Sequence, residues 1–134
     1  MELTADDRAL IAAAELVIAE HGDGETHTVG AAVRDDHGAL YVGVNLYHFT
    51  GGPCAELVAL AAARGAGVRA PDTIVAVGDA GRRVLSPCGR DRQVFADYYP
   101  GLRVIVPTAT EPIVVRAADL LPYGYDWRAH QSWP

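Results

Sequence analysis

The sequence has little that would suit secretion, a membrane or a polyanionic partner. Only two of its 134 residues are cysteines, so at most one disulfide can form, and the acidic N-terminus does not resemble a signal peptide. Charges or glycines interrupt the apolar runs well short of the length that spans a bilayer. Lysine and arginine total 11 against 17 acidic residues, and the net charge of −6 argues against binding nucleic acid. These absences predict a soluble, cytoplasmic protein with no membrane or nucleic-acid partner.

A single globular domain is expected over residues 1–134. Half of the residues are hydrophobic, which is enough for a core, and no internal repeat or low-complexity linker divides the chain. Helices are predicted between Thr4 and Gly22, from Pro53 to residue 64, from Pro87 to residue 99 and over residues 117–122. Strands are predicted over residues 28–34, 39–44, 73–78, 102–106 and 113–115. This order predicts an α/β fold in which helices cover one five-stranded mixed sheet.

Each cysteine follows a proline at a predicted helix start, in the segments GGPCAE and LSPCGR. Proline favours the first helical position, so Cys54 and Cys88 are expected in a first turn, where free amides and the helix dipole stabilise a thiolate. Asp91 lies three residues after Cys88, on the same helical face. Two sulfurs and one carboxylate oxygen would leave the fourth position of a zinc ion open for water, as in catalytic sites. Glu56 is then near enough to act on that water without being a ligand.

Simpler explanations exist for each of these residues taken alone. A single cysteine is often a small buried hydrophobic residue, and Cys54 and Cys88 could instead form a disulfide. An acid in the first turn of a helix, such as Glu56 or Asp91, needs no cause beyond the helix dipole. The combination of all four with the matched prolines favours a metal site.

These segments resemble the cytidine deaminase superfamily, whose signature has C-A-E at one helix start and P-C-x-x-C at the next. Within it, the segments GVNLYHFTGGPCAELVAL, LSPCGRDRQVF and LLPYGYDW are similar to the blasticidin S deaminases. The resemblance implies a three-layer α/β/α subunit, a homotetramer and one zinc ion per subunit. Nucleoside-salvage cytidine deaminases carry Asn-x-Glu in the long loop to hold ribose. Here Asn45 is followed by Leu46 and Tyr47, so that glutamate is missing.

The resemblance also implies roles for individual residues. Cys54 and Cys88 match thiolate ligands, and Glu56 matches the residue that shuttles protons. Asp91 stands where the family has its third cysteine, which keeps the formal charge of the donor set but replaces a soft sulfur by a harder oxygen. Contacts with the substrate are implied for four residues: Thr28, Asn45, Arg82 and Tyr125.

The implied reaction is hydrolytic deamination of a cytosine-type ring, in blasticidin S or a similar cytosine nucleoside, to a uracil-type ring and ammonia. Another aminopyrimidine base, nucleoside or analogue remains an open alternative. A second alternative is a metal-poor protein that only binds pyrimidines. Asp91 in place of the third cysteine is compatible with this alternative, whereas Glu56 argues against it because binding needs no proton shuttle. Editing of a polynucleotide is the weakest alternative, given the acidic charge.

Overall fold

The computed structural model describes residues 1–131, with side chains as far as residue 129. The last three residues of the predicted domain lie outside this range. The helices are α1 (Ala5–His21), α2 (Ala55–Gly65), α3 (Gly89–Tyr98), α4 (Trp127–Gln131) and the 3-10 helix η1 (Ala117–Leu120). The strands are β1 (Val29–Asp35), β2 (Leu40–Val44), β3 (Pro71–Gly78), β4 (Arg83–Leu85), β5 (Arg103–Val106) and β6 (Ile113–Arg116). Their order follows the predicted alternation, with β4 and α4 added to it.

The strands form one mixed sheet in the order β2-β1-β3-β5-β6. Strands β3 and β5 are parallel, and the other neighbours along this path are antiparallel. Strand β4 is a sixth member, which pairs antiparallel with the end of β3. The prediction of five strands missed β4 because three residues, from Arg83 to Leu85, are too few to show an alternation of apolar and polar side chains.

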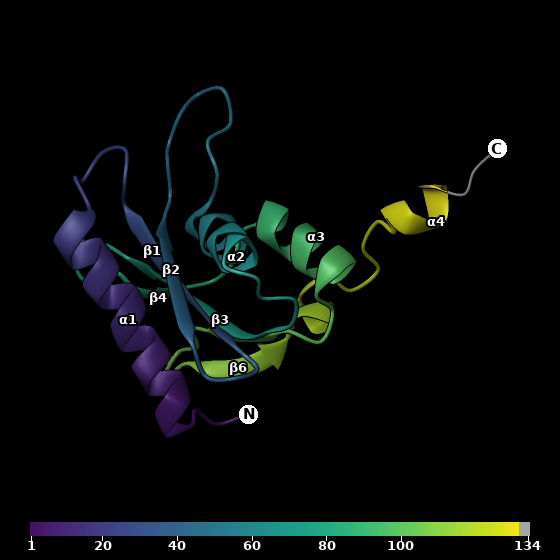
Figure 1. Cartoon of the computed structure of the whole chain (residues 1–134), viewed down its shortest axis with the longest axis horizontal. Coiled ribbons are helices and arrows are strands. Elements are labelled where there is room, and N and C mark those ends of the chain that lie inside the picture. The colour runs from purple at the N-terminus through teal and green to yellow at the C-terminus, as the bar shows by residue number, and fades with distance from the viewer. Residues whose placement is uncertain (132–134) are drawn as a thin grey trace.

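Helices cover both faces of this sheet (Figure 1). Successive residues of a strand point to opposite faces. Accordingly, Ala31 and Val33 of β1 belong to the core cluster that contains Ala59 of α2 and Phe95 of α3. Ala32, between them, belongs to a second cluster on the α1 side. Two cores on opposite faces of one sheet make the predicted three-layer α/β/α architecture, which is confirmed.

Helix α1 begins at a capping box formed by Thr4 and Asp7, and Asp7 also connects the helix to the sheet. The Asp7 backbone donates to Thr4 Oγ1 (3.1 Å), and Asp7 Oδ2 accepts from the Thr4 backbone (3.0 Å). The Asp7 carboxylate, fully buried, also accepts from Arg103 at 2.8 and 2.9 Å and from Arg34 at 3.1 Å. Burial alone would raise the pKa of Asp7, but the bonds from Arg103, Thr4 and Arg34 lower it well below its ordinary value.

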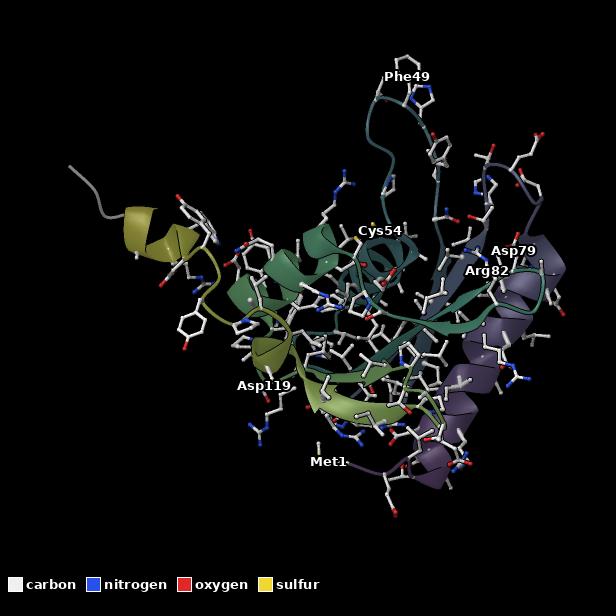
Figure 2. All side chains as sticks on the ribbon, turned by 180° about the vertical axis from the view of Figure 1, so that it is seen from behind. Met1, Phe49, Cys54, Asp79, Arg82 and Asp119 are labelled. Carbon is white, nitrogen blue, oxygen red and sulfur yellow. The ribbon has the colours of Figure 1, made fainter. Side chains whose placement is uncertain are left out.

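Helices α2 and α3 lie side by side on one face of the sheet (Figure 1). The loop from β2 to α2 projects beyond the layers and carries Phe49 at its tip (Figure 2). Within residues 1–131, no helix combines the length and the apolar character needed to cross a membrane. The fold thus brings two helix starts and one projecting loop to the same end of the domain.

Candidate metal centre and active site

Helices α2 and α3 each begin two residues later than predicted. Cys54 and Cys88 are the N-cap residues of α2 and α3, with extended backbones, and the prolines precede the caps instead of occupying the first helical positions. An N-cap residue still lies beside the free amides of the first turn. At α3, the Cys88 thiol accepts from the Asp91 backbone, and Asp91 Oδ2 accepts from the Cys88 backbone at 3.4 Å. The helix start therefore orients its own cysteine and aspartate.

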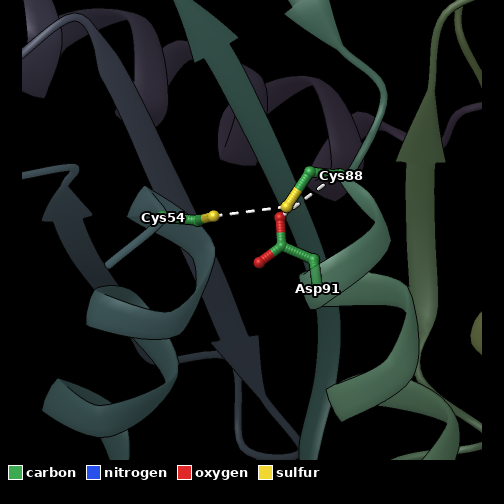
Figure 3. Close-up of side chains that lie close together, drawn as sticks. All are labelled: Cys54, Cys88 and Asp91. Atoms are coloured by element: carbon green, nitrogen blue, oxygen red, sulfur yellow. Dashed lines mark hydrogen bonds between the residues drawn. The ribbon is translucent and has the colours of Figure 1, made fainter. Parts of the chain in front are cut away.

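Tertiary folding brings these side chains together (Figure 3). The Sγ atoms of Cys54 and Cys88 are 3.2 Å apart, and both residues are free thiols. These two sulfurs and an Asp91 carboxylate oxygen all lie within 4.8 Å of one another. Asp91 is only 1% exposed, and its Oδ1 has no hydrogen-bond partner among the described residues. A buried carboxylate oxygen without a donor is costly, and a bound cation would remove that cost.

The electrostatics of the cluster point the same way. Burial first, and then the neighbouring Asp91 carboxylate, raise the pKa of Glu56 far above its ordinary value. The pKa of Cys54 is also raised, by burial, by its hydrogen bond with Cys88 and by the charge of Asp91. Without a cation, burial and the neighbouring acidic groups thus disfavour the ionised forms of Glu56 and Cys54, which are the forms that would act beside or on a metal. The donor set of two sulfurs and one carboxylate fits zinc, whose binding would offset that repulsion.

The cluster opens into a pocket of about 260 Å³. Its described lining holds the acids Glu56 and Asp91 and no basic residue; the other members are Val29, Asn45, Leu46, Tyr47, Gly52, Pro53, Cys54, Ala55, Ala76, Leu85, Ser86 and Cys88. A larger cavity of about 420 Å³ lies between the end of α1 and the β3–β4 turn. That cavity has no cysteine in its lining, so we place the chemistry in the smaller pocket.

Three of the four predicted substrate contacts form a connected group beside this pocket. Asn45 Oδ1 accepts from the backbones of Thr28 (2.7 Å) and Val29 (2.9 Å), and Asn45 Nδ2 donates to Thr28 Oγ1 (3.2 Å). The Arg82 guanidinium donates to the Thr28 carbonyl (2.7 Å) and to Asp79 Oδ1 (2.9 Å). Only Asn45 of the three lines the pocket itself. The structure therefore orders Thr28 and Arg82 through protein contacts at the pocket's edge.

Tyr125, the fourth predicted contact, lies elsewhere. Its backbone oxygen accepts from Gln93 Nε2 of α3 at 2.8 Å, and it lines a shallow surface pocket with Asp97 and Leu121. Within a single subunit, it does not meet the cysteine pair. Sequence reasoning also overlooked Ser86 as a lining residue, although its place two residues before Cys88 was a usable signal.

Comparisons with known proteins agree with this geometry. A blasticidin-S deaminase from Bacillus cereus is 33% identical in an alignment of 108 residues that covers 74% of this chain and 77% of that protein. A crystal structure of cytidine deaminase from Burkholderia pseudomallei superposes with a TM-score of 0.74 at 31% identity, covering 92% of this chain and 100% of that one. Cytidine deaminase from Mycobacterium tuberculosis gives 0.73 at 27% identity, covering 91% and 98%. No protein-family model matches the chain.

Proposed function

Because this chain belongs to the cytidine deaminase superfamily, and within it to the blasticidin-S deaminases, it is a hydrolytic deaminase; we propose that it uses zinc to deaminate blasticidin S or a similar cytosine nucleoside. The observation that carries the proposal is the convergence of Cys54, Cys88 and Asp91 next to buried Glu56 in one pocket. Blasticidin S is an antibiotic, and resistance to it is the biological role that we propose for its deamination by this protein.

The reaction divides between the metal and Glu56. Zinc held by Cys54, Cys88 and Asp91 would lower the pKa of a water molecule enough for attack near neutral pH. The charge of a bound cation would lower the raised pKa of Glu56, which would then accept the proton of the attacking water and return protons to the ring nitrogen and the departing amine. The C–N bond then breaks as the new carbonyl forms, and a cytosine-type ring plus water becomes a uracil-type ring plus ammonia. The burial of Glu56 favours this role because bulk water cannot exchange the shuttled proton freely.

Residues at the rim would position the rest of the substrate. Tyr47 lines the pocket at the position where salvage cytidine deaminases carry the ribose-binding glutamate, which favours a substrate with a different sugar. Arg82 is held by Asp79 and by the Thr28 carbonyl, and its side chain is 46% exposed. A planar guanidinium fixed in this way is suited to a carboxylate on the sugar. The roles of Thr28, Asn45, Arg82 and Tyr125 stay predictions from the family resemblance.

Purified protein reconstituted with zinc would test the proposal. Elemental analysis should give about one zinc per subunit, as expected for a mononuclear site. The ultraviolet change that accompanies ring deamination should be faster with blasticidin S than with cytidine or cytosine. Preferential turnover of another aminopyrimidine would replace the proposed substrate. Binding of pyrimidines without any turnover would favour the alternative of a catalytically impaired binding protein.

A homotetramer in the cytoplasm completes the proposal. The loop before α2 exposes three large apolar side chains, Leu46 (47%), Tyr47 (70%) and Phe49 (89%), and Phe49 lies at the loop tip (Figure 2). Exposed apolar groups gathered on one loop favour burial between subunits. Analytical ultracentrifugation at several concentrations would measure the assembly, and a monomer at micromolar concentration would contradict it.

A further inference from the structure

The two arginines that flank Asp91 on α3 both donate to backbone carbonyls that lead into the cysteines. Arg90 Nη1 donates to the Gly52 carbonyl at 3.0 Å, two residues before Cys54. Arg92 Nε donates to the Pro87 carbonyl at 2.8 Å, immediately before Cys88. Neither arginine lines the pocket, so neither is placed to touch a substrate in this subunit.

Arg92 fixes the approach to Cys88 from several directions. Besides Pro87, its guanidinium donates through Nη2 to Ser86 Oγ at 2.8 Å and through Nη1 to the Leu120 carbonyl at 3.2 Å. Three acceptors on three sides hold a planar fork in one orientation. The bonds join the segment before α3, α3 itself and η1. The position of the Cys88 N-cap therefore depends on Arg92 as well as on the helix.

Arg90 makes the corresponding connection to α2. Its bond to Gly52 reaches the neck of the projecting loop, where the Leu46 backbone donates to the Pro53 carbonyl at 3.1 Å. A Cβ on Gly52 would lie 1.6 Å from the Leu46 carbonyl oxygen, which shows how tightly this neck is closed. Helix α2 packs mainly on β1 and β2, and α3 packs on η1, so neither helix start is set mainly by the other helix. The bond from Arg90 crosses directly between the two starts.

We propose that Arg90 and Arg92 are positioning residues of the metal centre. They would hold the N-caps of α2 and α3 at the separation at which one ion can bind both sulfurs together with Asp91. Backbone carbonyls, rather than the ligand side chains, are the groups on which they act. The inference rests on the proposed function, because it concerns the same zinc site.

The test compares alanine variants of the two arginines with the wild type. Arg90→Ala and Arg92→Ala should each raise the zinc dissociation constant, measured against a chromophoric chelator, by about 10- to 100-fold, as for outer-shell partners of metal ligands. The absorption bands of the cobalt-substituted protein should also change, since they report the arrangement of sulfur donors. Arg64→Ala, at the exposed far end of α2, is the matched control and should leave both readouts unchanged.

Lysine variants separate geometry from charge. Arg92→Lys keeps the charge but loses the planar fork. It should therefore bind zinc more weakly than the wild type and show the same changed cobalt spectrum as Arg92→Ala. If Arg92→Ala fails to fold, Arg92→Lys and Arg90→Ala still test the proposal. Full recovery by lysine would overturn the proposal, because charge alone would then be sufficient.

Two further results would overturn the inference while leaving the proposed function intact. The first is a zinc dissociation constant and a cobalt spectrum equal to those of the wild type in both alanine variants. The second is a lower melting temperature with an unchanged cobalt spectrum, which would mean that the arginines only stabilise the fold. Failure of the wild type itself to bind zinc or cobalt would instead refute the proposed function.

Discussion

Replacing Asp91 by asparagine should stabilise the metal-free protein and weaken its response to zinc. Asp91 is almost fully buried beside Glu56, and its Oδ1 has no hydrogen-bond partner in the described structure. Asparagine has nearly the same shape, can still accept from the Cys88 backbone and removes a like charge from the cluster. Exchanging a buried charge with an unpaired oxygen for a neutral amide, whose Nδ2 can donate to the neighbouring sulfurs, is worth about 1–3 kcal/mol. At roughly 4 °C per kcal/mol for a domain of this size, the melting temperature should rise by about 4–12 °C.

Zinc should reduce the difference in stability between Asp91→Asn and the wild type. A neutral amide is a poorer donor than a carboxylate, so we expect the zinc dissociation constant of Asp91→Asn to rise at least about tenfold. Free zinc at 100 times the wild-type dissociation constant stabilises the wild type by about 2.7 kcal/mol. The same concentration is only ten times the dissociation constant of the variant and adds about 1.4 kcal/mol. The zinc-dependent increment should therefore fall by half.

Urea or thermal unfolding of metal-free and zinc-buffered samples measures both effects. Asp119→Asn, an exposed acid on η1 (Figure 2), is the matched control and should change stability by less than about 0.5 kcal/mol. If Asp91→Asn destabilises the metal-free protein, the Asp91 carboxylate makes a stabilising interaction there without a metal, which contradicts the reasoning from its unpaired Oδ1. An unchanged zinc increment would remove Asp91 from the set of ligands.

Three other changes test separate parts of the structure. Glu56→Gln should lower turnover by about 10²- to 10⁴-fold in a deamination assay while zinc content stays near that of the wild type; retained turnover would exclude Glu56 as the proton shuttle. Asp7→Asn should lower the free energy of unfolding by about 3 kcal/mol at pH 7, since it leaves Arg103 and Arg34 without their buried carboxylate. Because the pKa of Asp7 is lower in the folded than in the unfolded protein, this contribution is complete at neutral pH and is lost as the pH falls below about 4. Urea unfolding at pH 7 and at a pH below about 4 should thus show that the free energies of unfolding of the variant and the wild type converge in acid. A difference that stays constant between the two pH values would contradict the assignment. Gly52→Ala should raise KM and also lower the melting temperature, because the new Cβ would lie 1.6 Å from the Leu46 carbonyl oxygen and force the loop neck open. An unchanged KM would mean that the neck does not shape the pocket.

The fold was predictable because its signals are local. The capping box of Thr4 and Asp7 and the period of apolar residues in the strands depend on neighbours within a few positions. Strand β4 was missed since it is three residues long, and the helix starts were placed too early because Pro53 and Pro87 precede the N-caps here instead of taking the first helical position. The burial of Asp7 with Arg103 had no sequence signal, because its partner lies 96 residues away.

The candidate site divides in the same way. Matched Pro-Cys segments and the spacing of Asp91 from Cys88 indicated which residues could bind a metal, because residue type and helical spacing determine the available donors. The structure added the 3.2 Å approach of sulfurs that are 34 residues apart, and it placed Tyr125 away from them.

The amino-acid sequence by itself determined the kind of fold and the chemical character of the donor groups, because both follow from side-chain type and short-range periodicity. Only the tertiary structure decided that Arg90 and Arg92 bond to the carbonyls of Gly52 and Pro87. Every residue, glycine and proline included, offers the same backbone carbonyl. The sequence therefore cannot indicate which carbonyl accepts a hydrogen bond from an arginine, because only the packing of the chain selects it.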